Sequence, residues 1–265
     1  MKLHTPAGIS LGYEDAGHGN AVILLHAFPL SRAMWSAQVN ALQSEYRVIT
    51  PDLRGFGDTD RFTDAPSIET MADDVAALLD AINLREPIIL GGLSMGGYVS
   101  LAFARKYPHR LRALILADTR AEADSPEARH NRSASIELVK NQGPAALVEQ
   151  MLPKLLGERT TKEKPEVLAQ VRSIAASQSR PSIIGGLEAL RDRPDATAGL
   201  GKIRLPTLVL VGSEDSLTPP SVADALAARI AGARKVIISG AGHLANLEQP
   251  QLFNHALRSF LATPT

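Results

Sequence analysis

Short apolar segments alternate with helical patterns along most of this chain, and that alternation restricts its fold more than any other feature. Several of the segments are apolar along nearly their whole length, as expected for strands buried on both faces of a parallel sheet. We predict strands at Ile9–Glu14, Ala21–His26, Tyr46–Thr50, Pro87–Leu93, Leu111–Ala117, Pro206–Gly212 and Lys235–Ser239. Apolar residues recur at helical spacing between them, and strands alternating with helices predict a doubly wound α/β sheet.

One stretch departs from this alternation. From about Arg120 to Thr197 the sequence predicts no strand, only helical segments separated by prolines. We predict that residues 121–196 are a helical cap inserted into an α/β core of residues 1–120 and 197–265. A cap over the carboxyl edge of the sheet would cover the edge where such sheets bind ligands. An ordinary helical subdomain is the alternative.

Two local patterns refine this helical segment. Ser125-Pro126-Glu127 combines an N-cap residue, a first-turn proline and an acidic first-turn residue, so it predicts a helix start. Thr161–Lys164 is polar and charged, and we predict a solvated loop there.

Composition narrows the chemistry. The 265 residues suit one large domain with an insertion, and 28 Lys and Arg balance 28 Asp and Glu. A net charge of zero argues against nucleic acid as a partner, because nothing in the total attracts phosphates. The absence of Cys excludes disulfides, thiolate metal sites and a cysteine nucleophile. The reaction must therefore use oxygen, imidazole or carboxylate groups.

The sequence predicts neither membrane nor metal binding. No segment approaches the roughly 18 apolar residues that span a bilayer, and no His-x-x-x-His or similar ligand spacing occurs. Met1–Pro6 carries one positive charge and no following apolar stretch, so we expect no secretory signal and a cytoplasmic protein. The oligomeric state, a homo-oligomer included, is left open.

Ser94 is the predicted nucleophile. It is the centre of Gly92-Leu93-Ser94-Met95-Gly96, between a predicted buried strand and a predicted helix. Gly-x-Ser-x-Gly alone arises by chance, but in this context it indicates a sharp turn that exposes the serine. The following helix directs its N-terminal N–H groups at developing negative charge. A phosphate-binding turn is the alternative, but no Lys follows Gly96 as such a loop requires.

A serine hydroxyl needs a base, and His243 is the best placed of the seven histidines. It follows Gly242 in a loop between the last predicted strand and the last predicted helix, hence at the carboxyl edge of the sheet. His26 also ends a strand, but its neighbours indicate another role.

Asp215 is the predicted acid that orients the base. It follows the buried strand Pro206–Gly212, and the order Ser94, Asp215, His243 is the nucleophile–acid–base order of α/β hydrolases. Glu214 and Asp118 compete for this role. Asp118 is the stronger competitor because it also follows a strand, although it would otherwise serve as a cap or pair with Arg120.

The oxyanion of a tetrahedral intermediate needs donors. The backbone N–H of Met95, directly after the nucleophile, is one candidate. The N–H of Phe28, in the loop after Ala21–His26, is the other, because Pro29 has no N–H. The side chains of Phe28 and Met95 would then face the substrate or belong to the core.

Over nearly its whole length the sequence resembles α/β-hydrolase-fold serine hydrolases of the carboxylesterase and 3-oxoadipate enol-lactonase type. The resemblance rests on His26-Ala27-Phe28-Pro29, Pro51-Asp52-Leu53-Arg54-Gly55-Phe56-Gly57, Gly92-Leu93-Ser94-Met95-Gly96-Gly97, Gly212-Ser213-Glu214-Asp215 and Gly242-His243. It implies a mostly parallel eight-stranded sheet with helices on both faces, a helical cap and no cofactor. It also implies the site roles given above for Ser94, Asp215, His243, Phe28 and Met95.

The sequence departs from this family at Ala27, where similar proteins have Gly. Alanine is strained wherever φ must be positive, so we expect a slightly altered oxyanion loop. The Asp52–Arg54 loop is expected to be structural.

The leading hypothesis is a carboxylesterase acting on small or medium uncharged acyl esters, a small-molecule substrate. Residues 117–129 resemble small bacterial carboxylesterases more than enol-lactonases. Apolar cap residues would line the pocket or pack the cap: Leu138, Val139, Leu147, Leu152 and Ile184.

Three alternatives stay open. An enol-lactonase would need a cation for its anionic substrate, with Arg120, Arg129 or Arg132 as candidates. Cofactor-free perhydrolysis, as in haloperoxidases, would use the same triad. A ligand receptor that retains the hydrolase fold is the third. Haloalkane dehalogenases and epoxide hydrolases need Asp where Ser94 stands and are set aside.

Overall fold

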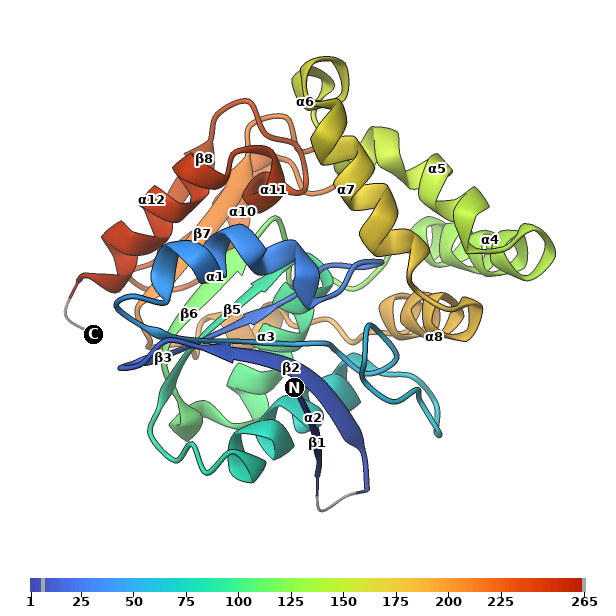
Figure 1. Ribbon diagram of the computed structural model, residues 1–265. Coiled ribbons are helices and arrows are strands. Elements are labelled where there is room, and N and C mark those ends of the chain that lie inside the picture. Colours follow the sequence, from blue (N-terminus) through green and yellow to red (C-terminus); the bar gives the residue numbers. More distant parts are fainter. Residues whose placement is uncertain (6–7, 264–265) are drawn as a thin grey trace.

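A twisted eight-stranded sheet forms the centre of the protein, and helices cover both of its faces (Figure 1). The computed structural model describes residues 1–5 and 8–263. The strands are β1 (Lys2–His4), β2 (Ser10–Ala16), β3 (Ala21–Leu25), β4 (Arg47–Pro51), β5 (Ile88–Leu93), β6 (Leu111–Ala117), β7 (Thr207–Gly212) and β8 (Arg234–Ile238). Their order is β1-β2-β4-β3-β5-β6-β7-β8. The pairs β1–β2 and β2–β4 are antiparallel and the others are parallel, which confirms the predicted fold class.

The strands pack a separate apolar layer on each face of the sheet. In β3, Val22 and Leu24 belong to one buried cluster, and Ile23 and Leu25 belong to the other. One face is covered by α1 (Ser36–Leu42), α11 (Ala245–Glu248) and α12 (Pro250–Leu261), and the other by α2 (Ile68–Ala81), α3 (Met95–Lys106) and α10 (Pro220–Ala228). The short helices η1 (Arg32–Trp35), η2 (Pro108–Arg110) and α9 (Thr197–Leu200) complete the core. Burial on both faces explains why β3 and β5 are apolar throughout.

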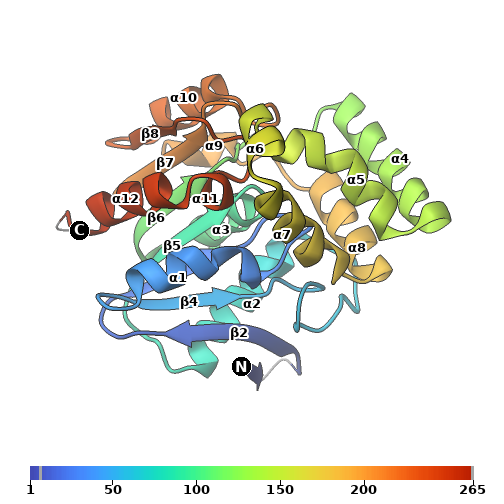
Figure 2. The same ribbon diagram turned by 45° about the horizontal axis from the view of Figure 1, so that its top comes forward.

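The segment predicted as a cap, hereafter the insertion (residues 121–196), leaves the carboxyl end of β6 and stays at that end of the sheet (Figure 2). Its helices are α4 (Pro126–Gln142), α5 (Pro144–Leu155), α6 (Glu158–Glu163), α7 (Pro165–Ala176) and α8 (Arg180–Arg191). Within the described residues the insertion contains no strand. Ser125 caps α4 as predicted, since its hydroxyl accepts the N–H of Ala128 at 3.1 Å.

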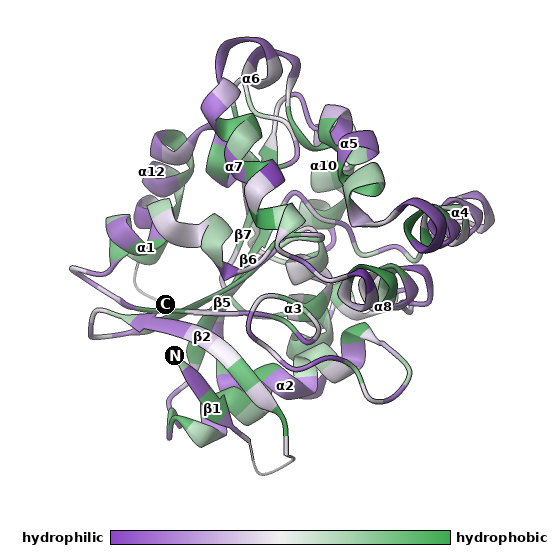
Figure 3. Ribbon diagram, turned by 45° about the vertical axis from the view of Figure 1, so that its right-hand side comes forward, coloured by the Kyte–Doolittle hydropathy of each residue, from purple (hydrophilic) through white to green (hydrophobic). Residues whose placement is uncertain are grey.

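The structure corrects two local expectations. β1 was not predicted, because three residues with little burial leave no apolar pattern. The loop predicted at Thr161–Lys164 is wrong for the first three residues, because α6 continues to Glu163. Thr161, Lys162 and Glu163 are solvent-exposed as expected, whereas Lys164 lies outside the helix and is partly buried. The Glu158–Lys162 (2.5 Å) and Arg159–Glu163 (2.8 Å) pairs lie one helical turn apart and stabilise this turn. Figure 3 accordingly colours α6 and the outer side of α4 mainly as hydrophilic.

Candidate active site

Ser94 occupies a strained turn between β5 and α3. Its backbone has φ 53° and ψ −111°, a region that non-glycine residues rarely adopt. A Cβ at Gly92 would overlap the carbonyl of Gly96, and a Cβ at Gly96 would overlap the carbonyl of Leu25. Glycine at both positions therefore lets the strand, the turn and the helix approach closely enough to hold Ser94 in this conformation.

Ser94, His243 and Asp215 form a continuous hydrogen-bonded chain. His243 Nε2 lies 2.8 Å from Ser94 Oγ, and His243 Nδ1 lies 2.8 Å from Asp215 Oδ2. A carboxylate can only accept, so Nδ1 carries the proton and Nε2 is left to accept the Ser94 O–H. The three side chains come from loops after β5, β7 and β8, which meet at the carboxyl edge of the sheet. This geometry suits removal of the serine proton by the imidazole.

Asp215 is a buried carboxylate surrounded by donors. Oδ1 accepts the N–H groups of Leu217 (2.8 Å) and Thr218 (2.9 Å), and Oδ2 accepts the Thr218 hydroxyl (2.5 Å). Burial alone would raise the pKa of Asp215, but the charge of His243 and the hydrogen bonds from His243 and Thr218 hold it well below its usual range. Asp215 therefore keeps the charge that orients an imidazolium. Glu214, the neighbouring candidate, is solvent-exposed.

Asp118 directly follows β6, and in the described part of the chain no hydrogen bond joins it to His243. Its Oδ1 accepts the N–H of Gly212 at 2.8 Å, which joins the ends of β6 and β7. Complete burial, followed by the negative charge of Asp215, raises the pKa of Asp118 well above its usual value. Within residues 1–5 and 8–263 no ion pair joins Asp118 to Arg120, whose guanidinium donates to the carbonyl of Leu217. The pKa values of the two strand-end carboxyls are thus shifted in opposite directions, and only Asp215 is hydrogen-bonded to His243.

The N–H groups of Phe28 and Met95 are the predicted oxyanion donors. Among the hydrogen bonds of the described residues, neither of these N–H groups donates to another group of the chain. Both residues are buried, at 4% and 0% exposure, and belong to the same apolar cluster. That their side chains also face a bound substrate stays a prediction.

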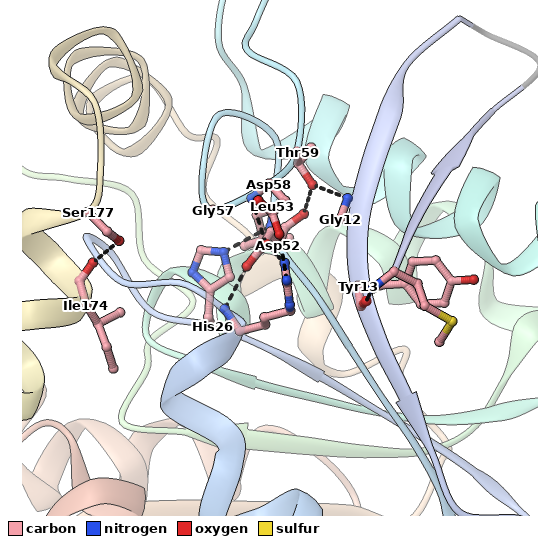
Figure 4. Close-up of polar contacts among 12 residues, drawn as sticks. Gly12, Tyr13, His26, Asp52, Leu53, Gly57, Asp58, Thr59, Ile174 and Ser177 are labelled. Atoms are coloured by element: carbon pink, nitrogen blue, oxygen red, sulfur yellow. Dashed lines mark hydrogen bonds and ion pairs between the residues drawn. The ribbon is translucent and has the colours of Figure 1, made fainter.

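His26 and Asp52 support the loop that carries Phe28 (Figure 4). His26 is fully buried, and its Nε2 accepts the N–H of Leu53 at 2.9 Å while Nδ1 donates to the carbonyl of Ala27 at 3.0 Å. Burial lowers the pKa of His26, which keeps this ring neutral. Asp52 accepts the N–H of Asp58 at 2.9 Å and forms an ion pair with Arg32. The structural role expected for the Asp52–Arg54 loop agrees with these contacts.

Ala27 fits the oxyanion loop without strain. The non-glycine residues with positive φ are Asn83, Ser94 and Asp118 among those described, so Ala27 does not need the conformation that favours glycine. It is fully buried, and its N–H donates to the Met34 sulfur at 3.2 Å. The expected disturbance from replacing glycine is absent at this position.

The cations suggested for an anionic substrate are all engaged within the protein. Arg129 pairs with Asp192 at 2.8 Å, and Arg132 pairs with Asp124 at 3.2 Å. Arg120 donates to a main-chain carbonyl, as described above. A carboxylate substrate would have to compete with these partners.

The insertion packs directly on the loop that carries Phe28. A Cβ at Gly186 in α8 would lie 2.7 Å from the Phe56 ring and 3.0 Å from the Phe28 ring. Of the apolar residues expected to line a pocket, Val139, Leu147 and Leu152 are buried, at 0%, 2% and 4% exposure, in apolar clusters that also contain residues of the α/β core. The remaining two, Leu138 and Ile184, are partly exposed.

Sequence reasoning missed Glu248. This residue is 0% exposed, and its carboxylate accepts the N–H groups of Gly242 and Leu244, on either side of His243. Its position, five residues after His243 and before Pro250, resembles that of any helical glutamate, so no sequence signal separates it from surface residues.

In residues 1–5 and 8–263 no cluster of three or more His, Asp or Glu side chains is arranged to hold a metal ion. Over the same ranges, no helix combines the length and apolar character needed to cross a bilayer.

Comparison with known proteins agrees with this architecture. Residues 20–250 match the family model described as alpha/beta hydrolase fold. The chain is 32% identical to the AB hydrolase superfamily protein YisY of Bacillus subtilis, with 97% of each chain covered. It is 27% identical to 3-oxoadipate enol-lactonase 2 of Acinetobacter baylyi, over 97% of this chain and 95% of that one. A thermophilic esterase from Thermogutta terrifontis, solved with malate bound, superposes with a TM-score of 0.95 at 45% identity, covering 98% of this chain and 97% of that one.

The protein therefore belongs to the α/β-hydrolase-fold family, and it is a hydrolase of the esterase and enol-lactonase type.

Proposed function

We propose that this protein is a carboxylesterase that cleaves esters of small or medium uncharged acyl groups through a covalent acyl-enzyme. The observation that carries the proposal is the hydrogen-bonded chain from Ser94 through His243 to Asp215, with both links at 2.8 Å. Its order and its position at the carboxyl edge of the sheet match the requirements of acyl transfer.

In the proposed reaction, His243 Nε2 removes the proton of Ser94 as Oγ attacks the ester carbonyl. The N–H groups of Phe28 and Met95 hold the developing oxyanion, and Asp215 stabilises the imidazolium. The C–O bond to the alcohol then breaks, and His243 returns its proton to the departing alkoxide. Water, deprotonated by the same imidazole, attacks the acyl-enzyme and releases the carboxylic acid.

One observation supports an uncharged substrate: the candidate cations Arg120, Arg129 and Arg132 already have partners within the protein. The similar Thermogutta terrifontis structure is named an esterase, which supports ester hydrolysis. We also propose that the insertion covers the site, because α8 packs on the Phe28 loop.

The experiment that tests the function compares two substrates and two proteins. Wild-type protein should hydrolyse a short p-nitrophenyl ester faster than an anionic enol-lactone, and Ser94→Ala should lose at least about 10⁴-fold of the ester activity while keeping its Tm. Faster turnover of the lactone would reassign the substrate class to enol-lactones. Full ester activity in a folded Ser94→Ala protein would contradict the mechanism.

A further inference from the structure

Glu248 is a buried carboxylate next to the proposed base, and the proposed reaction does not use it. Its Oε1 accepts hydrogen bonds from the N–H groups of Gly242 (2.9 Å) and Leu244 (3.3 Å). Because these residues flank His243, a single oxygen restrains the backbone on both sides of the base.

The rest of Glu248 is bound to the insertion. Its Oε2 accepts the N–H of Gly157 at 2.8 Å, and its main-chain carbonyl accepts the Lys164 ammonium at 2.6 Å. The N–H of Leu244 also bonds to the carbonyl of Leu155 at 3.2 Å. One residue therefore connects the base loop to the link between α5 and α6.

The two connected backbones touch. A Cβ at Gly242 would overlap the backbone N of Gly157, and a Cβ at Gly157 would lie 3.1 Å from the backbone N of Gly242. Glycine at both positions permits this approach, and the approach brings both sets of N–H groups within reach of one carboxylate. The contact thus depends on one glycine of the insertion, Gly157, and one glycine of the core, Gly242.

The chemistry of this contact requires an acceptor at both oxygens. An ionised carboxylate accepts at both, whereas an amide places N–H₂ on one side. In a glutamine at position 248, that N–H₂ would face either Gly157 or the Gly242–Leu244 pair, and one connection would be lost. Glu248→Gln therefore removes one hydrogen-bond acceptor while keeping the shape and volume of the side chain nearly unchanged.

We propose that Glu248 is a positioning residue of the site, an inference that rests on the proposed esterase function. Its carboxylate holds His243 toward Ser94, and the hold depends on contact between the insertion at Leu155–Gly157 and the base loop. Glu248 does not touch the reacting atoms, so its effect should appear in turnover more than in substrate binding.

The test is Glu248→Gln, with Glu163→Gln as the matched control, since Glu163 is an exposed glutamate of the insertion. We expect kcat for a p-nitrophenyl ester to fall about 10- to 100-fold with KM within about threefold, because small displacements of a base are costly. The low-field proton NMR signal of the His243–Asp215 hydrogen bond should weaken or shift in the folded variant. Glu163→Gln should leave all three readouts unchanged.

Wild-type kcat and an unchanged NMR signal in folded Glu248→Gln would overturn the inference. The rate at which a fluorophosphonate labels Ser94 is a separate readout that needs no ester turnover. If wild-type protein cleaves no ester, the proposed function fails, and labelling still decides the role of Glu248: slower labelling of Glu248→Gln supports it and equal labelling overturns it.

Should Glu248→Gln not fold, amide hydrogen exchange in the wild-type protein decides. Gly157, Gly242 and Leu244 should exchange much more slowly than exposed amides of α6, because a buried acceptor holds each of them. Exchange as fast as in exposed amides would overturn the inference.

Discussion

The α/β core and the insertion are held together by different means. In the core, the carboxylate of Asp215 is buried and hydrogen-bonded to His243, Leu217 and Thr218. Many of the charged contacts of the insertion are exposed instead, such as Arg172 with Glu149 (2.7 Å), whose side chains are 47% and 56% exposed. Exposed pairs contribute little to stability. Substitutions in the core are therefore expected to lower catalytic activity directly. Substitutions in the insertion are expected to lower it only where the insertion contacts the core.

The largest expected effect separates the two buried carboxyls of the core. Asp215→Asn should lower kcat about 10⁴-fold, because an amide beside Nδ1 favours the wrong imidazole tautomer. Asp118→Asn should keep kcat within about threefold, since Asp118 bonds to the N–H of Gly212 and not to His243. The measurement is the steady-state hydrolysis of a p-nitrophenyl ester by both variants.

Stability provides the control for this pair. In the unfolded chain Asp118 loses its proton above the ordinary pKa of 3.8. In the folded protein the pKa of Asp118 is raised, so the proton is held to higher pH. At pH 7 this difference favours unfolding, so Asp118→Asn should raise Tm at pH 7. A large loss of activity in Asp118→Asn with full activity in Asp215→Asn would reverse the assignment of the acid.

A smaller effect is expected where the insertion meets the core. In Gly186→Ala the new methyl group would press on the rings of Phe56 and Phe28, so kcat should fall about tenfold as the proposed oxyanion donor Phe28 moves. Alanine improves helix propensity by about 1 kcal/mol, so this loss cannot come from a weaker α8. Gly199→Ala is the matched control, because a Cβ at Gly199 meets no atom within 4 Å. Equal kcat values for Gly186→Ala and Gly199→Ala would contradict the prediction that packing of α8 on the Phe28 loop affects catalysis.

The smallest expected effect concerns the pH dependence of core stability. Burial lowers the pKa of His26 below 6.5, so the stability from neutral His26 is complete above pH 6.5 and is lost as the pH falls toward the folded-state value. Between pH 7.5 and 5.5 we expect a loss of at most about 1.4 kcal/mol from this group. In urea unfolding, the free energy of unfolding of His26→Gln should fall by that much less than the wild-type value between pH 7.5 and 5.5. If the pH dependence of unfolding were the same in His26→Gln and wild-type protein, the predicted contribution of neutral His26 to stability would be wrong.

Most of the core was predictable because each of its features leaves a local pattern. Doubly buried strands such as β5 are apolar throughout, and Gly92-x-Ser94-x-Gly96 marks a turn that requires small neighbours. The structure brings Ser94, His243 and Asp215 together as their places after strands suggested, and their catalytic roles stay predictions.

What the sequence did not predict depends on contacts between distant segments. Glu248 bonds to Gly157, which lies 91 positions away, and neither residue has a local signature of that contact. The end of α6 was missed because Thr161–Glu163 has no apolar residue to mark a helical face, and its charge pairs reach back to Glu158 and Arg159. The partners of Arg120 were likewise beyond sequence reasoning, because Leu217 approaches it only in the folded chain.

The proposed reaction requires that Ser94 becomes acylated, and trapping the acyl-enzyme tests this step most directly. Protein mixed with an activated ester and quenched in acid should gain the mass of one acyl group, and peptide mass spectrometry should place that group on Ser94. His243→Ala should gain far less, because its serine lacks a base. Ester turnover with no acyl group on Ser94, or with the group on another residue, would contradict the account.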